Sequence, residues 1–247
     1  MRITILVLFS VFFFFSYGPA EAEWQTKEEF TKWMTYYYLN PEPEKISSAI
    51  QYLSDQNILD DTKAFPPTFG FLSGIFNANE NQVTQWMETF KTLPDSKYRV
   101  MVLSLWYANF TNSKTRVHGI LQKRQTLTDD LNILFENNPM SVTEIPLEKG
   151  AWVLDSLWGN FMATGNKEPV ARIIEALPWF DVKGDWNRLM IGRAAAWSLT
   201  SNAIQHKKVI DICELERINQ TQDIADKLDI IVTTARKKLL TKTSTDY

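Results

Sequence analysis

Two histidines and a single cysteine hold most of the capacity of this 247-residue chain for acid–base or metal chemistry. His206 and Cys213 are seven residues apart, so on one helix they would share a face. That separation is a rise of about 10 Å, far beyond the hydrogen-bond distance that a thiol–imidazole nucleophile requires. His118 lies in the basic polar stretch 115–119, where we expect it to be exposed to solvent. With no second histidine at ligand spacing, neither histidine indicates a zinc site.

Carboxylate pairs are the other candidates for chemistry. The pair at 129–130 fits the first turn of a helix, where negative charge interacts favourably with the backbone dipole, and the pair at 60–61 lies next to an expected turn. Asp181 and Asp185 flank Gly184, but a calcium loop needs more oxygen ligands at regular offsets. The chain has no phosphate-binding glycine loop and no Gly-x-Ser-x-Gly nucleophile motif. We therefore expect no catalytic residue, no cofactor and no metal site.

The segment 179–186 is the strongest candidate for contact with a partner. Its candidate contact residues are Trp179, Phe180, Asp181, Asp185 and Trp186. A connection between helices is not where a buried core is normally built, and large aromatic side chains are common anchors at interfaces. The alternative is that these aromatics pack inward and seal the ends of a helical hairpin.

Helical spacing dominates the chain, and no alternating strand pattern is evident. Apolar residues recur at offsets 0, 3, 4 and 7 in segments that start at Ile46, Val83 and Val170, and at the first three of these offsets from Val209. A degenerate copy starts at Thr128. The segments thus repeat with a period of about 40 residues, as stacked helical hairpins do.

Turn and stop signals support the pairing of helices. An aromatic residue followed by small and turn-forming residues precedes two of the copies, at 76–79 and 161–166. Leu-Pro dipeptides at 93–94 and 177–178 then predict the ends of the second helices, because proline cannot continue a helix beyond its first turn.

The segment 161–166 reads Phe-Met-Ala-Thr-Gly-Asn and is followed by Pro169-Val170 and Ile173-Ile174. Over about 40 residues this pattern resembles the hairpin turn of tetratricopeptide-like or Sel1-like repeats. Their Trp, Leu-Gly and Tyr signature is not met, since Trp158-Gly159 stands out of register with it. The resemblance implies an all-α fold of stacked antiparallel helical hairpins, an α-solenoid of about five pairs, and a protein-binding surface. It transfers no functional residue, and an irregular helical bundle is the alternative arrangement.

Residues 1–22 have the features of a secretory signal peptide. Arg2 supplies a positive charge, 3–17 is an apolar run, and Ala20-Glu21-Ala22 has the small-x-small form of a cleavage site. The apolar run is about 15 residues, short of the roughly 20 that span a bilayer, so an uncleaved anchor is the less favoured alternative. We expect cleavage between Ala22 and Glu23, a single helical domain over 23–247, and a secreted or periplasmic protein.

Charge, hydropathy and cysteine content bear on the kinds of partner, on membrane spans and on disulfide bonds. A formal net charge of −3 gives no electrostatic reason to expect nucleic acid as a partner. No second long apolar run follows the signal peptide, so we expect no stable membrane span after cleavage. Cys213 has no cysteine with which to form an internal disulfide, and its match to core positions of the other copies predicts a buried packing residue.

These features favour a noncatalytic binding or scaffold module whose partner is another protein. One alternative is an enzyme that uses converging carboxylates in a helical fold. The other is a carrier of an apolar ligand between aromatic-rich helices, although the small residues at 191–199 favour close helix packing over an internal cavity.

The predicted cleavage site is directly testable. Amino-terminal sequencing of exported protein should give Glu23 as the first residue, because Ala20 and Ala22 are the small residues that signal peptidase accepts. Recovery of the chain in the membrane fraction with Met1 intact would identify an anchor instead.

Overall fold

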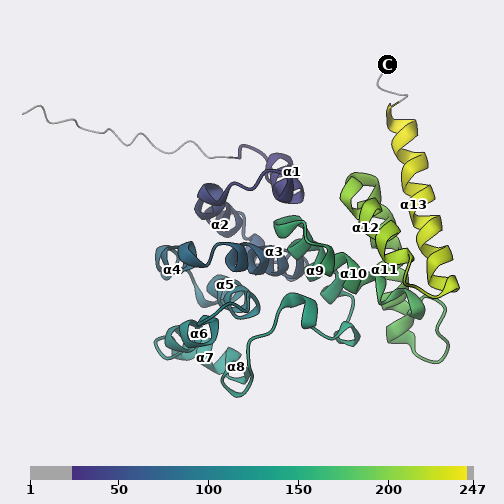
Figure 1. Cartoon of the computed structure of the whole chain (residues 1–247). Helices are drawn as coiled ribbons and strands as arrows, with labels where there is room; N and C mark the ends of the chain where they lie inside the picture. The colour runs from purple at the N-terminus through teal and green to yellow at the C-terminus, as the bar shows by residue number, and fades with distance from the viewer. Residues whose placement is uncertain (1–23, 244–247) are drawn as a thin grey trace, which may run out of the picture.

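The computed structural model describes residues 24–243, which form thirteen α-helices and six short 3₁₀ helices and contain no β-strand. The predicted all-α class is therefore confirmed (Figure 1). The expected signal peptide and its cleavage site lie outside the described residues. Within 24–243, no helix is long and apolar enough to cross a membrane.

The chain divides in sequence into an N-terminal and a C-terminal group of helices. The N-terminal group comprises α1 (Lys27–Tyr36), η1 (Tyr37–Leu39), η2 (Pro43–Lys45), α2 (Ile46–Asp55), η3 (Ile58–Asp60), α3 (Phe65–Ala78), α4 (Glu80–Thr89), α5 (Asp95–Tyr107), α6 (Ser113–Leu121), α7 (Gln125–Leu131) and α8 (Ile133–Glu136). The C-terminal group comprises η4 (Val142–Glu144), η5 (Leu147–Lys149), α9 (Trp152–Thr164), α10 (Lys167–Ile174), η6 (Leu177–Trp179), α11 (Trp186–Gln205), α12 (Lys207–Arg217) and α13 (Gln222–Thr243). Figure 1 shows α13 beside α11 and α12 and extending beyond them, and both of these helices contact it.

The repeated apolar positions are buried. Every residue at offsets 0, 3, 4 and 7 from Ile46, Val83 and Val170 lies in the core, as do the three that start at Val209. Cys213 is one of these and is fully buried, as the repeat predicted. The turns also lie where they were expected, since α3 ends at Ala78 before α4, and Gly165 and Asn166 separate α9 from α10.

Three local predictions were wrong. Asp129 and Asp130 are not in the first turn of a helix, because α7 already begins at Gln125. The degenerate copy from Thr128 is broken between α7 and α8, and Leu131 is its only buried residue. The Leu-Pro dipeptides do not end α4 and α10, which stop several residues earlier, and 177–179 forms the 3₁₀ helix η6.

Two hydrophobic clusters form the core, one mostly within α1–α7 and one mostly within η4–α13. Helices α3 and α9 make the most extensive contact between elements and join the two clusters. Phe69 of α3 belongs to the C-terminal cluster and Ala163 of α9 to the N-terminal one, so each helix inserts into the other core.

Glycines let α3 and α9 approach backbone to backbone. A Cβ atom on Gly70 would overlap the carbonyl oxygen of Ser156, and one on Gly159 would overlap the carbonyl oxygen of Pro67. Neither clash could be relieved by rotating a flexible side chain, since the obstructing atoms belong to the opposing main chain. The distance between the two helices is therefore set by the absence of side chains at these two positions.

Gly159→Ala should destabilise the protein. An alanine normally favours a helix over glycine by about 1 kcal/mol, but the clash with Pro67 should reverse the sign and cost about 3 kcal/mol. Urea unfolding of both proteins measures the difference in free energy. Gly119→Ala in α6 is the matched control, because a Cβ there would meet no atom within 4 Å, and it should be neutral or stabilising. A Gly159→Ala protein as stable as the wild type would show that the two helices can separate freely.

Candidate functional site

The connection between η6 and α11 is held against α11 by a close backbone approach. A Cβ on Gly192 would overlap the main chain of Trp179 and Phe180, so glycine allows this turn to cross the helix. Trp179 is half-buried, and the Arg188 guanidinium lies 5.1 Å from the centre of its ring. Phe180 is also half-buried, with the Lys227 ammonium of α13 5.9 Å from its ring centre.

The two aspartates of this segment have structural partners. Asp185 caps α11, accepting a hydrogen bond from the Arg188 backbone N–H at 3.0 Å. Asp181 is exposed and lies 3.6 Å from the ammonium of Lys227. Four of the five predicted contact residues thus take part in contacts that anchor the turn to α11 and α13.

Trp186 differs from the other four because its side chain is 72% exposed. It begins a row along one face of α11 that continues with Met190, Arg193 and Trp197, at i, i+4, i+7 and i+11. Met190 is 48% exposed, Trp197 is 73% exposed, and Arg193 is also exposed. We call these four residues the α11 ridge.

The opposite face of α11 is buried, with Ile191 and Leu199 in the core. Its buried residues include Gly192, Ala195 and Ala203, which bring the helix close to its neighbours. α11 contacts η5, η6, α10, α12 and α13. Sequence reasoning identified the small residues and Trp186 but missed the other three members of the ridge. Their spacing of 4, 7 and 11 residues from Trp186 places them on the same helix face, and this pattern could have identified them.

His206 is the linker residue between α11 and α12, and it is almost completely buried. Its ring lies among the rings of Tyr36, Tyr38 and Phe161, with centroid distances of 5.1 to 5.7 Å. The Tyr38 hydroxyl is 3.2 Å from Nδ1, and Nε2 is buried without a hydrogen-bond partner among the described residues. The Lys208 ammonium lies 5.7 Å from the Tyr38 ring centre. Burial lowers the pKa of His206 to about 4, so the ring is neutral at pH 7.

The remaining chemical candidates are dispersed. His118 was expected to be exposed, but it is half-buried, with Nε2 3.3 Å from the Leu134 carbonyl oxygen and its ring beside that of Phe135. Burial raises the pKa of the Cys213 thiol to about 12, so it is not a thiolate at neutral pH. Among residues 24–243, no group of three His, Cys, Asp or Glu side chains is placed to hold a metal ion.

Comparisons of the chain with protein-family models, with curated proteins and with solved structures found no match.

Acid should weaken the fold through His206. Its pKa is depressed in the folded state, so the unfolded chain binds the proton more readily, and stability present above pH 6.5 is lost as the pH falls towards 4. The full loss from this ring amounts to about 3 kcal/mol. Urea unfolding at pH 7 and pH 4.5 should show a smaller decrease for His206→Gln than for the wild type. Equal decreases in the two proteins would contradict the assignment.

Proposed function

We propose that this protein is an exported, noncatalytic module that binds another protein through the α11 ridge. The observation that carries the proposal is the exposure of Trp186 and Trp197, both above 70%, on one face of a well-packed helix. Isolated exposed apolar residues are ordinary on protein surfaces, but large apolar side chains gathered on one face mark interaction sites.

The composition of the ridge supports the same conclusion. Tryptophan, methionine and arginine are enriched at protein interfaces relative to the rest of the surface. The ridge consists of these residue types alone, at the spacing that amphipathic helices use to bind a groove. Its ends, Trp186 and Trp197, are about 16 Å apart along the helix axis, enough for two separate anchor pockets.

The partner should present an apolar groove with one acidic side chain. The two tryptophans and Met190 require apolar pockets, while Arg193 requires a carboxylate between them. The turn at 179–185 is anchored to the inner side of α11 and to α13, so it holds the helix in place beside the ridge.

We also infer that the helices stack as hairpins and that the protein is exported. Helices that follow one another contact each other in the pairs α3–α4, α5–α6, α9–α10 and α11–α12, which supports stacked hairpins similar to tetratricopeptide-like or Sel1-like repeats. The features of residues 1–22 support export. A binding module outside the cytoplasm is consistent with both.

A double variant, Trp186→Ala with Trp197→Ala, tests the function. Protein captured by the wild type from the exported fraction is identified by mass spectrometry, purified, and titrated against both forms. Each tryptophan should contribute about 2 kcal/mol to binding if it is an anchor. Because both side chains are exposed, the free energy of unfolding should change by no more than about 0.5 kcal/mol.

Leu39→Ala is the matched control, since it truncates another large apolar side chain that is 65% exposed, on η1. It should leave the affinity unchanged. The proposal is wrong if the double variant binds the purified partner as tightly as the wild type, or if the wild type captures no protein.

A further inference from the structure

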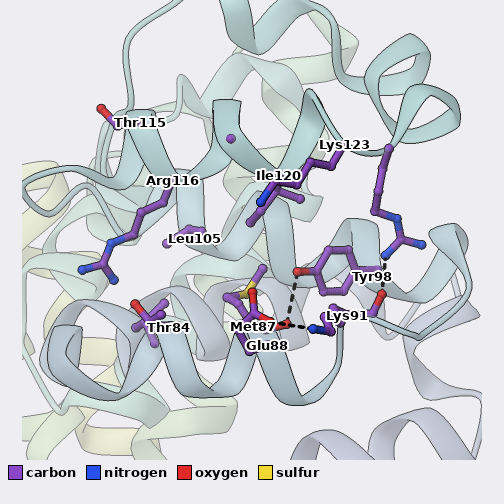
Figure 2. Close-up of a pocket in the computed structure, with 13 residues that line it drawn as sticks. Thr84, Met87, Glu88, Lys91, Tyr98, Leu105, Thr115, Arg116, Ile120 and Lys123 are labelled. Atoms are coloured by element: carbon purple, nitrogen blue, oxygen red, sulfur yellow. Dashed lines mark hydrogen bonds and ion pairs between the residues drawn. The ribbon is translucent and has the colours of Figure 1, made fainter.

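A cleft of about 540 Å³ opens between α4, α5 and α6, in the N-terminal group of helices and away from α11. Figure 2 shows α4 along one wall and the segment from Thr115 to Lys123 along the other, with Leu105 and Tyr98 of α5 between them. Its volume lies within the range of small-molecule sites, which is roughly 300–1,000 Å³.

The floor of the cleft is apolar. Val83 and Met87 of α4 and Leu105 of α5 belong to the hydrophobic core, and Ile120 of α6 packs against it. The Tyr98 hydroxyl donates to the Met87 carbonyl oxygen at 3.2 Å, so this polar atom is already satisfied. Of these apolar side chains, Ile120 is half-buried and Met87 is 6% exposed, so an alkyl or aromatic body in the cleft would contact these two.

The rim of the cleft is basic. Lys91, Arg116, Lys123 and Arg124 line it, against the single carboxylate of Glu88. Three of these cations have acidic partners: Lys91 pairs with Glu88 at 2.9 Å, Arg116 with Glu80 at 3.8 Å, and Arg124 with Asp95.

Lys123 is the rim cation that no carboxylate of residues 24–243 pairs with at ion-pair distance, and its side chain is exposed. The cleft therefore combines an apolar floor with one positive charge in excess over its ion pairs. That combination is complementary to a ligand with an apolar body and a single negative charge.

Gly119 leaves open space in the wall of the cleft. It lies inside α6, where glycine destabilises a helix relative to alanine, and it lines the cleft. A Cβ at this position would meet no atom within 4 Å, and its backbone is not in the left-handed region. Neither close packing nor backbone conformation requires a glycine here, unlike at Gly70 and Gly159. What the missing side chain provides is free space in the cleft.

We propose that this cleft binds a single-chain amphiphile with one anionic headgroup, such as a fatty acid. The alkyl chain lies over Ile120 and the exposed edge of Met87, in the space left by Gly119. The carboxylate accepts hydrogen bonds from the Lys123 ammonium at the rim. This site is separate from the α11 ridge and does not depend on it.

Calorimetric titration with dodecanoate below its micelle concentration tests the proposal on the full chain. The wild type should bind one equivalent. Gly119→Leu should weaken binding by about tenfold or more, because its side chain occupies the space of the ligand, while leaving the fold intact. Lys123→Gln should weaken binding by about fivefold through loss of the headgroup contact.

Two controls separate specific from general binding. Thr233→Leu places the same side chain at an exposed position of α13, outside the cleft, and should leave the affinity for dodecanoate unchanged. Dodecyltrimethylammonium has the same chain with a positive headgroup and should show no saturable binding to the wild type. The proposal is overturned if dodecanoate does not bind, if Gly119→Leu binds it as tightly as the wild type while its thermal melt is unchanged, or if the cationic amphiphile binds equally well.

Discussion

The backbone contact between α3 and α9 is the constraint on which the rest of the structure depends. Two helices normally pack through their side chains at axial distances of about 8–10 Å. Here Gly70 and Gly159 remove the side chains at the crossing, and each main chain abuts the other. Because each of these helices inserts a side chain into the other core, the spacing at this crossing sets the positions of both hydrophobic clusters.

Small residues have two different effects in this protein. At the α3–α9 crossing and at Gly192, glycines allow two main chains to come into contact, and no open space remains between them. Along α11 several small residues lie on the buried inner face, and Trp186 and Trp197 lie on the exposed outer face. At Gly119 no neighbour fills the space, and a cleft remains. Small residues thus lie opposite the α11 ridge and beside the cleft, and they differ in whether another element packs against them.

The helical class, the buried positions and several turns could be predicted from the sequence because they depend on local spacing. Ile50 and Ile174 occupy equivalent offsets in amphipathic segments, and burial of such a face is the main source of helix stability. Predictions that depended on helix boundaries failed. Asp129 was predicted to lie in the first turn of a helix, but α7 begins four residues before it. Pro94 and Pro178 were predicted to end α4 and α10, but both helices end before these prolines.

The candidate sites depend on tertiary contacts, and for that reason only part of them could be predicted. Trp186 was identified from its place after a connection. Trp197, about three turns further along the same face of α11, could have been core or surface until the neighbours of α11 were known. The environment of His118 is made by Phe135 and Leu134, which lie in a different helix. The cleft is likewise lined by residues of α4 and α6. The spacing of apolar residues within each helix does not predict that the two helices lie side by side.

The contact between Tyr38 and His206 links residues that are 168 positions apart in the chain. η1 also packs on α9, so a segment near the start of the domain rests on a helix of the C-terminal group. A chain made from its amino terminus cannot close this contact until residue 206 has emerged, and long-range contacts of this kind slow folding. The rings of Tyr36 and Tyr38 therefore lack the His206 ring as a neighbour until most of the protein has been made.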